Sequence, residues 1–243
     1  MSAPVFVVPT ERLTPGVVVV DGAEGRHAAT VTRLAAGEAV VLVDGHGRRG
    51  DGVVVSAGRD RVEVEVASVD DVPSPEPRFV VVQALPKGDR GELAVETMTE
   101  AGVDVVVPWA ASRCVTRWRA DRADKALAKW RTSSTAAAKQ SRRSRFPDVT
   151  ELATTAEVTA LLAAAALGAV LHETSTVPLA GVALPADGDV VLVVGPEGGV
   201  TDDELGSFLE AGAATYRLGE TVLRTSTAGV AALAVLSAAT RWR

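Results

Sequence analysis

The sequence predicts an α/β fold in two parts, a small β-barrel followed by a larger domain built on a parallel sheet. Short apolar segments follow one another closely over residues 1–70, which is typical of a barrel. After residue 78, continuous apolar strands alternate with helical segments, which indicates a parallel sheet that is buried on both faces. A proline-rich stretch at residues 73–77 separates the two patterns.

The first part is predicted to consist of short strands at residues 4–8, 16–20, 38–43, 51–56 and 61–66. In the last of these, Val62, Val64 and Val66 alternate with charged residues, which is the period of a half-exposed strand. Residues 44–47 read Asp-Gly-His-Gly, a hairpin-type turn. Residues 24–34 are the exception, because their apolar positions recur with helical spacing.

The linker is predicted from its prolines. Residues 69–77 combine three prolines with acidic side chains, and such a segment is held extended rather than placed inside a sheet or helix. We therefore expect one domain at residues 1–72, a linker at 73–77 and a second domain at 78–243.

The second part begins with a strand at residues 79–85, a turn at 86–90 and a helix at 92–101 that Gly102 ends. A strand at 103–108 and a helix at 121–140 follow, and Pro147 prevents the second helix from continuing. The remaining expected elements are an Ala-rich helix within 149–167, strands at 169–173, 190–194 and 213–218, and a helix at 225–239.

A glycine-rich turn follows the strand at 190–194. Residues 195–199 read Gly-Pro-Glu-Gly-Gly, and open α/β sheets bind ligands at the carboxyl ends of their strands. The turn lacks a Lys, and Thr201 and Glu204 have the spacing of a capping box, so a phosphate loop is disfavoured. The glycines instead allow the backbone to approach a flat or neutral ligand closely. An ordinary strand–turn–helix connection explains the glycines equally well.

The charge distribution predicts contact with nucleic acid despite a net charge of −6. A basic stripe in the middle of the chain is opposed by only two acids, Asp121 and Asp124. Its members are Arg113, Arg117, Arg119, Arg122, Lys125, Lys129, Arg131, Lys139, Arg142, Arg143 and Arg145. Such a stripe neutralises phosphates, and the alternative is a solvated charged face.

Composition excludes several classes of protein. No apolar run has the length of a membrane span, and the N-terminus lacks the pattern of a signal peptide. The single cysteine, Cys114, cannot form an internal disulfide, which favours a reducing cytoplasm and a structural thiol. His27, His46 and His172 lie far apart in the sequence, so no metal site is expected.

Two motifs together carry a resemblance to a known family. Residues 195–199 pair with Leu218-Gly219 and with residues 223–228, which read Leu-Arg-Thr-Ser-Thr-Ala. This pairing resembles the SPOUT methyltransferases, and most closely the ribosomal RNA small subunit methyltransferase E family, which makes N3-methyluridine in 16S rRNA. The chain departs from the family pattern at Thr221, where Arg is frequent, and at Ser226, where Glu is frequent.

The resemblance implies a fold, a cofactor and partners. The fold would be a SPOUT-type parallel sheet with a trefoil knot, preceded by a PUA-like β-barrel. The cofactor would be S-adenosylmethionine, and the partners would be 16S rRNA in the 30S subunit and a second copy of the chain paired through the knot domain. Three more stretches match the family at residues 25–37, 83–90 and 130–143. They imply RNA contacts by Arg26, His27, Arg33, Lys87, Arg90, Gln140, Ser141 and Arg143.

The cofactor residues implied are Leu171, His172, Glu173, Val194, Gly195, Pro196, Glu197, Gly198, Gly199, Leu218, Gly219, Val222, Leu223, Thr225 and Ser226. Methylation of uridine N3 requires loss of its proton, and a cation would stabilise the developing uracil anion. Arg224 is the first candidate for this role, ahead of Arg90 and Arg33. Glu197 is a candidate general base, or it caps its own loop. The alternatives are a non-catalytic RNA-binding protein, a SPOUT methyltransferase for another RNA site, and a phosphate-binding hydrolase or kinase.

Overall fold

The structure, a computed structural model, describes residues 3–119 and 121–243, which divide into two compact units. The first unit comprises the chain up to Ser74 together with Ala138–Phe146, and the second comprises Pro75–Ala137 and Pro147–Arg243. The sequence had assigned residues 138–146 to the second domain. None of the helices in the described part of the chain combines the length and hydrophobicity that a membrane crossing requires.

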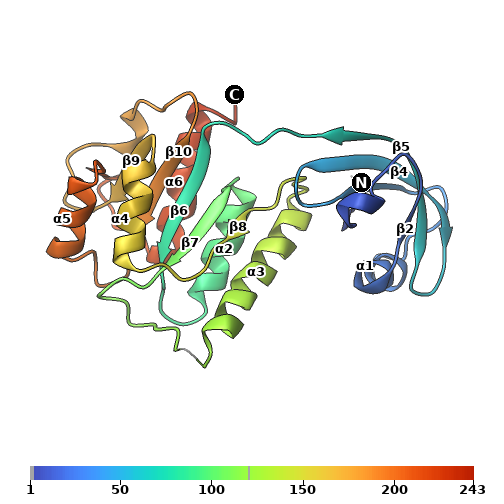
Figure 1. The fold of residues 1–243 in the computed structure, drawn as a ribbon, viewed down its shortest axis with the longest axis horizontal. Helices are drawn as coiled ribbons and strands as arrows, with labels where there is room; N and C mark the ends of the chain where they lie inside the picture. Colours follow the sequence, from blue (N-terminus) through green and yellow to red (C-terminus); the bar gives the residue numbers. More distant parts are fainter. Residues whose placement is uncertain (1–2, 120) are drawn as a thin grey trace. The chain divides into compact units, whose positions relative to one another are not determined.

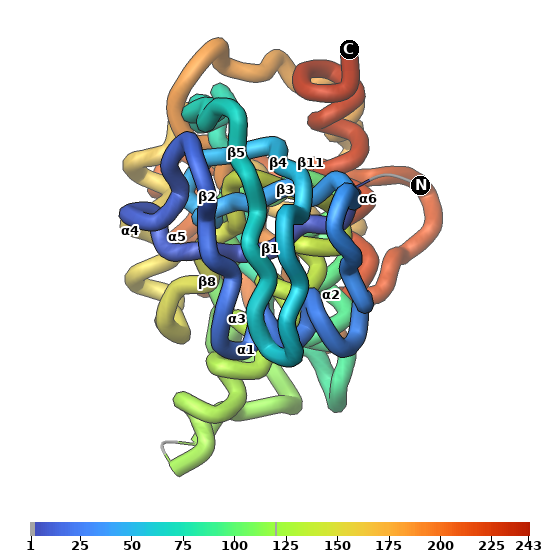
Figure 2. The backbone as a smooth tube through the Cα atoms, turned by 90° about the vertical axis from the view of Figure 1, so that its right-hand side faces the viewer, coloured from blue at the N-terminus to red at the C-terminus, as the bar shows by residue number. Residues whose placement is uncertain are grey.

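The first unit is built on one five-stranded sheet in the order β1-β3-β4-β5-β2. Its strands are β1 (Val5–Val7), β2 (Gly16–Val20), β3 (Ala39–Val43), β4 (Arg48–Ala57) and β5 (Val62–Asp71), and Figure 2 traces them in blue to teal. Only β1 and β3 pair in parallel. The alternating valines of β5 are buried beside Phe6, Leu13 and Leu42, which form the core of this unit.

Two elements of this unit differ from the expectation. Strand β5 continues to Asp71 because it pairs with β4 along its whole length, so Asp70 and Asp71, just before the predicted linker, are strand. The predicted helix is shorter than expected: α1 (Gly22–Arg26) continues as one π-helical turn, η2 (His27–Val31). Arg33 then takes a left-handed conformation with φ 59°, which ends the helical segment. A further short turn, η1, spans Thr10–Arg12.

The segment Ala138–Phe146 is held to the first unit by contacts between residues far apart in the sequence. The Lys139 ammonium lies 2.6 and 2.8 Å from the two carboxylate oxygens of Glu24. The Gly47 N–H donates to the Ser144 carbonyl at 3.0 Å, and the Phe146 N–H donates to the Gly45 carbonyl at 2.8 Å. These bonds explain why residues late in the sequence belong to the N-terminal unit.

The second unit contains a six-stranded sheet in the order β11-β9-β10-β6-β7-β8, and every pair is parallel. Its strands are β6 (Arg78–Ala84), β7 (Val105–Trp109), β8 (Asp148–Val149), β9 (Leu167–Leu171), β10 (Asp189–Val194) and β11 (Ala214–Tyr216). The central strands are buried over nearly their whole length, as continuous apolar runs predict. The predicted α/β fold with a parallel sheet is therefore confirmed.

Helices cover this sheet in two groups (Figure 1). Helices α2 (Arg90–Glu100) and α6 (Thr225–Ala239) contact each other, and α6 also contacts β6 and β10. Helices α4 (Thr155–Ala164) and α5 (Asp202–Glu210) form the other pair. Helix α3 spans Ala123–Gln140, and a short turn, η3, spans Leu179–Gly181. Gly229 allows the close approach of α6 to α2, since a Cβ there would lie 2.5 Å from the Met98 sulfur.

Strand β9 begins and ends two residues earlier than predicted, so His172 and Glu173 lie in the loop that follows it. The expected Ala-rich helix is confined to α4, because Thr154 caps its start and Glu157 completes the capping box. The shift of β9 matters for function because His172 and Glu173, which line a cavity at the carboxyl edge of the sheet, lie in a loop rather than in the strand.

Candidate active site

A cavity of about 580 Å³ opens at the carboxyl ends of β9, β10 and β11. Its size is within the range of small-molecule sites, and its position is the one expected for a ligand of an open α/β sheet. Its walls are the loops after these three strands and the first turn of α6. The lining residues are Arg113, Leu171, His172, Glu173, Val194, Gly195, Pro196, Glu197, Gly198, Gly199, Val200, Asp202, Tyr216, Arg217, Leu218, Gly219, Glu220, Thr221, Val222, Leu223, Arg224, Thr225 and Ala228.

The glycine loop, residues 195–199, requires its glycines for close packing. A Cβ on Gly195 would lie 2.9 Å from Cγ2 of Val200, and a Cβ on Gly198 would lie 3.0 Å from Cβ of Arg113. Gly199 has φ 74°, a conformation that side chains disfavour. The loop therefore brings bare backbone to the cavity wall, as the sequence predicted.

The Glu204 side chain connects the start of α5, just after the glycine loop, to the segment after β7. One carboxylate oxygen completes the predicted capping box by accepting the Thr201 N–H at 3.0 Å. The other oxygen accepts the Ser112 N–H at 2.8 Å and the Thr155 hydroxyl at 3.3 Å. Burial acts to raise the pKa of Glu204, but the hydrogen bonds from Thr201 and Ser112 outweigh it and hold the pKa below its usual value. The sequence predicted only the cap.

Two further contacts tie the neighbouring loops together. The Arg113 guanidinium donates to the Gly198 carbonyl at 3.2 Å. The backbone N–H of Lys87, in the loop after β6, donates to Oε1 of Glu197 at 3.1 Å. Glu197 therefore connects two loops at the carboxyl edge of the sheet, whichever chemical role it also has.

The loop after β11, residues 217–224, forms the opposite wall. Arg217 is fixed by backbone hydrogen bonds to Val177 and Leu179, both 2.9 Å. Beyond it the wall is open: no atom lies within 4 Å of a Cβ added at Gly219. Val222 lines this wall and is 78% exposed, so its side chain is free to contact a ligand.

The cavity collects all but one of the predicted cofactor residues. The exception is Ser226, which is buried in the first turn of α6 behind the wall. Its hydroxyl oxygen has no hydrogen-bond partner among residues 3–119 and 121–243. Arg224, the predicted catalytic cation, lines the cavity and is exposed at the N-cap of α6. Lining residues that the sequence did not select for the cofactor site are Arg113, Val200, Asp202, Tyr216, Arg217, Glu220, Thr221 and Ala228.

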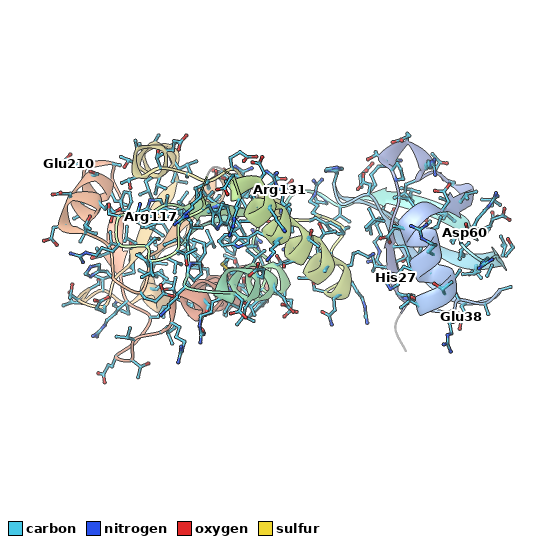
Figure 3. All side chains as sticks on the ribbon, turned by 90° about the horizontal axis from the view of Figure 1, so that it is seen from below. His27, Glu38, Asp60, Arg117, Arg131 and Glu210 are labelled. Atoms are coloured by element: carbon cyan, nitrogen blue, oxygen red, sulfur yellow. The ribbon has the colours of Figure 1, made fainter. Side chains whose placement is uncertain are left out.

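The predicted RNA contacts divide between the two units. Lys87 and Arg90 belong to the second unit, in the loop after β6 and at the start of α2. Arg26, His27 and Arg33 belong to the first unit, and their side chains are exposed; Figure 3 labels His27. Gln140, Ser141 and Arg143 also belong to the first unit, because Ala138–Phe146 does. The sequence had assigned these last three to the second domain.

Several members of the basic stripe are already paired within the protein. Arg131, labelled in Figure 3, donates to the Val149 carbonyl at 3.0 Å and lies 2.9 Å from the Glu151 carboxylate. Lys139 pairs with Glu24, as described above. Arg117, also labelled in Figure 3, is exposed in the segment before α3. The stripe is therefore not one uniform phosphate-binding surface.

Cys114 is buried, and its sulfur lies 3.9 Å from the Trp109 carbonyl. Burial raises the pKa of the Cys114 thiol, so the thiolate is disfavoured at neutral pH, as expected for a structural thiol. Among the described residues, no group of three or more His, Cys, Asp and Glu side chains is placed to hold a metal ion.

Comparisons with known proteins identify the family. A family model described as "RNA methyltransferase domain" matches residues 73–237, and a second, described as "RNA methyltransferase PUA domain", matches residues 20–67. A curated protein of Mycobacterium tuberculosis, ribosomal RNA small subunit methyltransferase E, is 47% identical over 100% of this chain and 94% of its own length. The chain belongs to the ribosomal RNA small subunit methyltransferase E family. The member from Bacillus subtilis is 27% identical over 90% of this chain and 88% of its own.

Solved structures of methyltransferases share the whole fold. A ribosomal RNA small subunit methyltransferase E from Neisseria gonorrhoeae, bound to S-adenosyl methionine, superposes with a TM-score of 0.85 at 27% identity over 98% of both chains. A putative methyltransferase from Legionella pneumophila, in complex with the same cofactor, gives a TM-score of 0.84 at 27% identity over 98% of both chains. The α/β fold and the PUA-like N-terminal domain are thereby established for this chain.

The cavity has the chemistry that such a cofactor needs. Leu171, Leu218 and Leu223 offer apolar contact for an adenine ring, and the glycine loop offers backbone groups. The four acids Glu173, Glu197, Asp202 and Glu220 outnumber the three arginines of the lining, and Glu197 and Asp202 lie at the glycine loop, where negative charge favours a sulfonium cation and opposes a phosphate. The residues present therefore fit S-adenosylmethionine and disfavour a nucleoside triphosphate.

Proposed function

We propose that this protein methylates N3 of one uridine in 16S rRNA of the small ribosomal subunit, with S-adenosylmethionine as methyl donor. The observation that carries the proposal is the cavity at the carboxyl edge of the sheet, where the glycine loop and residues 217–224 meet. Membership of the family supports the reaction class, and the choice of uridine N3 rests on the resemblance of the two motifs.

The cofactor would be held by Leu171, Gly195, Leu218 and Leu223, through backbone groups and apolar contacts, with the other residues of the two loops around them. When bound there, S-adenosylmethionine supplies an electrophilic methyl group on sulfur. The protein has to exclude water and hold the uridine so that N3 faces that methyl group. The exposed side chains of Val222 and Leu223 are placed to cover the ligand.

Arg224 is the residue we assign to the transition state. N3 of neutral uridine carries a proton, so the base becomes anionic as that proton leaves, and a guanidinium stabilises the negative charge. Arg224 lines the cavity, whereas Arg33 lies in the first unit and Arg90 at the start of α2, which makes them weaker candidates. Glu197 can accept a proton through the carboxylate oxygen that does not bind the Lys87 N–H. The target uridine has to leave its stack to reach this site.

The knot, the dimer and the RNA-binding residues belong to the same proposal. Helix α6 contacts η3, β6 and β10, and Arg217 pairs with Val177 and Leu179 in the β9–β10 connection, which supports a knotted path for the last segment. The small side chains of α6 suit close pairing with a second copy. The exposed positions of Arg26, His27, Arg33 and Lys87 support contacts to 16S rRNA, and such a substrate places the protein in the cytoplasm.

Titration calorimetry with S-adenosylmethionine and mass spectrometry of RNA from treated 30S subunits test the proposal. We expect Gly195→Trp to abolish cofactor binding because its side chain cannot fit beside Val200. We expect Arg224→Ala to keep the cofactor affinity within about three-fold and to lower methyl transfer by about 100-fold or more. A wild-type chain that binds RNA but no cofactor would instead be a non-catalytic RNA-binding protein. A methyl group on another nucleotide would contradict the N3-uridine assignment, and stabilisation by ATP alone would revive a phosphate site.

A further inference from the structure

The second unit contains another cavity of about 580 Å³, separate from the candidate active site. It lies at the carboxyl end of β6, between the loop after that strand, the start of α2 and the first turns of α3. None of its lining residues lines the first cavity. They are Leu85, Pro86, Gly88, Gly91, Glu92, Thr116, Trp118, Asp121, Arg122, Lys125, Ala126, Lys129 and Trp130.

Two tryptophans form the apolar part of this cavity. Trp130 is buried against the start of α2, where a Cβ on Gly91 would lie 2.6 Å from the indole nitrogen. Trp118 packs edge-to-face on Trp130, with ring centroids 5.2 Å apart and an angle of 85° between the rings. Trp118 itself remains partly exposed. A fixed aromatic ring with a free surface is the usual platform for a nucleobase in single-stranded RNA.

Three cations line the same cavity. Arg122, Lys125 and Lys129 are three and four residues apart, which is the spacing of side chains on one face of a helix, and all three are exposed. Arg122 lies 3.6 Å from Asp121, but both side chains are largely exposed, so this pair holds the guanidinium weakly. The three cations can therefore turn towards an anion at the cavity mouth.

The two cavities are neighbours along one edge of the sheet. Arg113 lines the first cavity and donates to the Gly198 carbonyl at 3.2 Å. Thr116, three residues later, lines the second cavity and donates its hydroxyl to the Pro86 carbonyl at 2.7 Å. Three residues of extended chain span at most about 11 Å. One short, anchored segment therefore connects the wall of one cavity to the wall of the other.

We propose that the second cavity binds a nucleotide that flanks the target uridine in the same single-stranded RNA. Its base would lie against Trp118, and its phosphate would contact Arg122, Lys125 and Lys129. The inference rests on the proposed RNA methylation, because it needs a target nucleotide in the first cavity. The inference assigns to the second unit an RNA contact close to the reacting base. This contact would tolerate different base sequences, and it would add to any contact that the first unit makes.

The acids of the cavity limit where the phosphate can bind. Glu92 lines the cavity from α2, and its carboxylate makes no hydrogen bond or ion pair with any described residue, while Asp121 lies before α3. Both carboxylates repel a phosphate and accept hydrogen bonds from base N–H groups. The phosphate is therefore expected on the side of Lys125 and Lys129, with the base directed towards the tryptophans and Glu92.

The test is equilibrium binding of the full chain to unmethylated 30S subunits at several salt concentrations, together with calorimetry for S-adenosylmethionine. Loss of base stacking costs about 1–3 kcal/mol, so Trp118→Leu is expected to weaken 30S binding by about ten-fold. Trp118→Phe, which keeps an aromatic ring, is expected to restore most of that affinity. Lys125→Ala is expected to lower the slope of log affinity against log salt by about 0.7. Arg243→Ala, an exposed cation at the end of the chain, is the matched control and should change neither quantity.

The cofactor affinity should stay unchanged in all these variants, because none of the altered side chains lines the first cavity. The proposal is overturned if Trp118→Leu and Lys125→Ala bind 30S subunits as tightly as the wild type, or if Arg243→Ala weakens binding to the same extent. Wild-type chain that binds 30S subunits with these dependences but transfers no methyl group would reject the proposed function and the flanking role of the nucleotide, and would support only RNA binding at the second cavity.

Discussion

Glu204 provides a sharp test of how the active-site loops are held. The substitution Glu204→Gln keeps the size of the side chain but replaces one carboxylate oxygen by an NH₂ group. Each carboxylate oxygen accepts a backbone N–H, from Ser112 at 2.8 Å on one side and from Thr201 at 3.0 Å on the other. Whichever way the amide turns, one of these N–H groups then faces a donor. Glu204 is only 4% exposed, so water cannot replace the lost acceptor easily.

The expected loss of stability is about 2–3 kcal/mol, the cost of one unsatisfied buried donor combined with a weakened charged hydrogen bond. For a unit of this size, that loss corresponds to a Tm about 4–12 °C lower. Differential scanning calorimetry of the second unit's transition measures it. Glu210→Gln, on the last turn of the same helix and exposed (Figure 3), is the control and should change Tm by little.

The effect should also depend on pH. The folded pKa of Glu204 is lowered, so its ionised form stabilises the fold above the unfolded pKa of about 4.5, and this contribution is lost as pH falls through the folded value. The wild type and Glu204→Gln should therefore differ fully at pH 7 and converge in acid. A variant whose stability stays within about 0.5 kcal/mol of the wild type at pH 7 would refute the reasoning, and so would a gap that does not shrink at low pH.

Three further outcomes follow from local packing. Gly195→Ala should destabilise the second unit by about 1–3 kcal/mol and weaken cofactor binding, because its Cβ meets Val200 at 2.9 Å. Chemical denaturation measures the stability and calorimetry measures the cofactor affinity, and unchanged values would contradict the tight turn. Gly229→Val should cost at least as much, since the Cβ position lies 2.5 Å from the Met98 sulfur, and an unchanged unfolding midpoint would contradict the α2–α6 contact. Cys114 should react with iodoacetamide much more slowly than a free thiol at pH 7 because burial raises its pKa, and rapid alkylation of the native protein would contradict that burial.

The sequence could predict the structural features that depend on residues close together in the chain. The buried strands, the capping box at Thr201 and the glycine loop are all set by neighbours in the chain, and the structure has each of them. The second bond of Glu204, to Ser112, joins residues 92 positions apart, and no local pattern signals it. Arg113 was predicted only as part of the basic stripe for the same reason.

The end of α3 shows the same limit in a different way. Its helical pattern and the basic residues after it were predicted, but their partner was not. Lys139 pairs with Glu24 across 115 residues of sequence, and this pair helps to assign Ala138–Phe146 to the first unit. The charge of Lys139 had been counted towards phosphate binding, whereas its side chain is partly buried in an ion pair. A run of like charges in sequence therefore overstates the charge available to RNA.

The net charge of −6 is compatible with an RNA substrate because the two cavities divide the charges between them. Four acids line the first cavity and favour a cationic sulfonium, while Arg113, Arg217 and Arg224 add positive charge to the same walls. In the second cavity three exposed cations, Arg122, Lys125 and Lys129, outnumber the two acids, Glu92 and Asp121. A polyanion is thus attracted to the edge of the sheet without being drawn onto the glycine loop, where Glu197 and Asp202 oppose phosphate. In the proposed complex, the RNA phosphates would therefore contact the second cavity, and only the target base would enter the first.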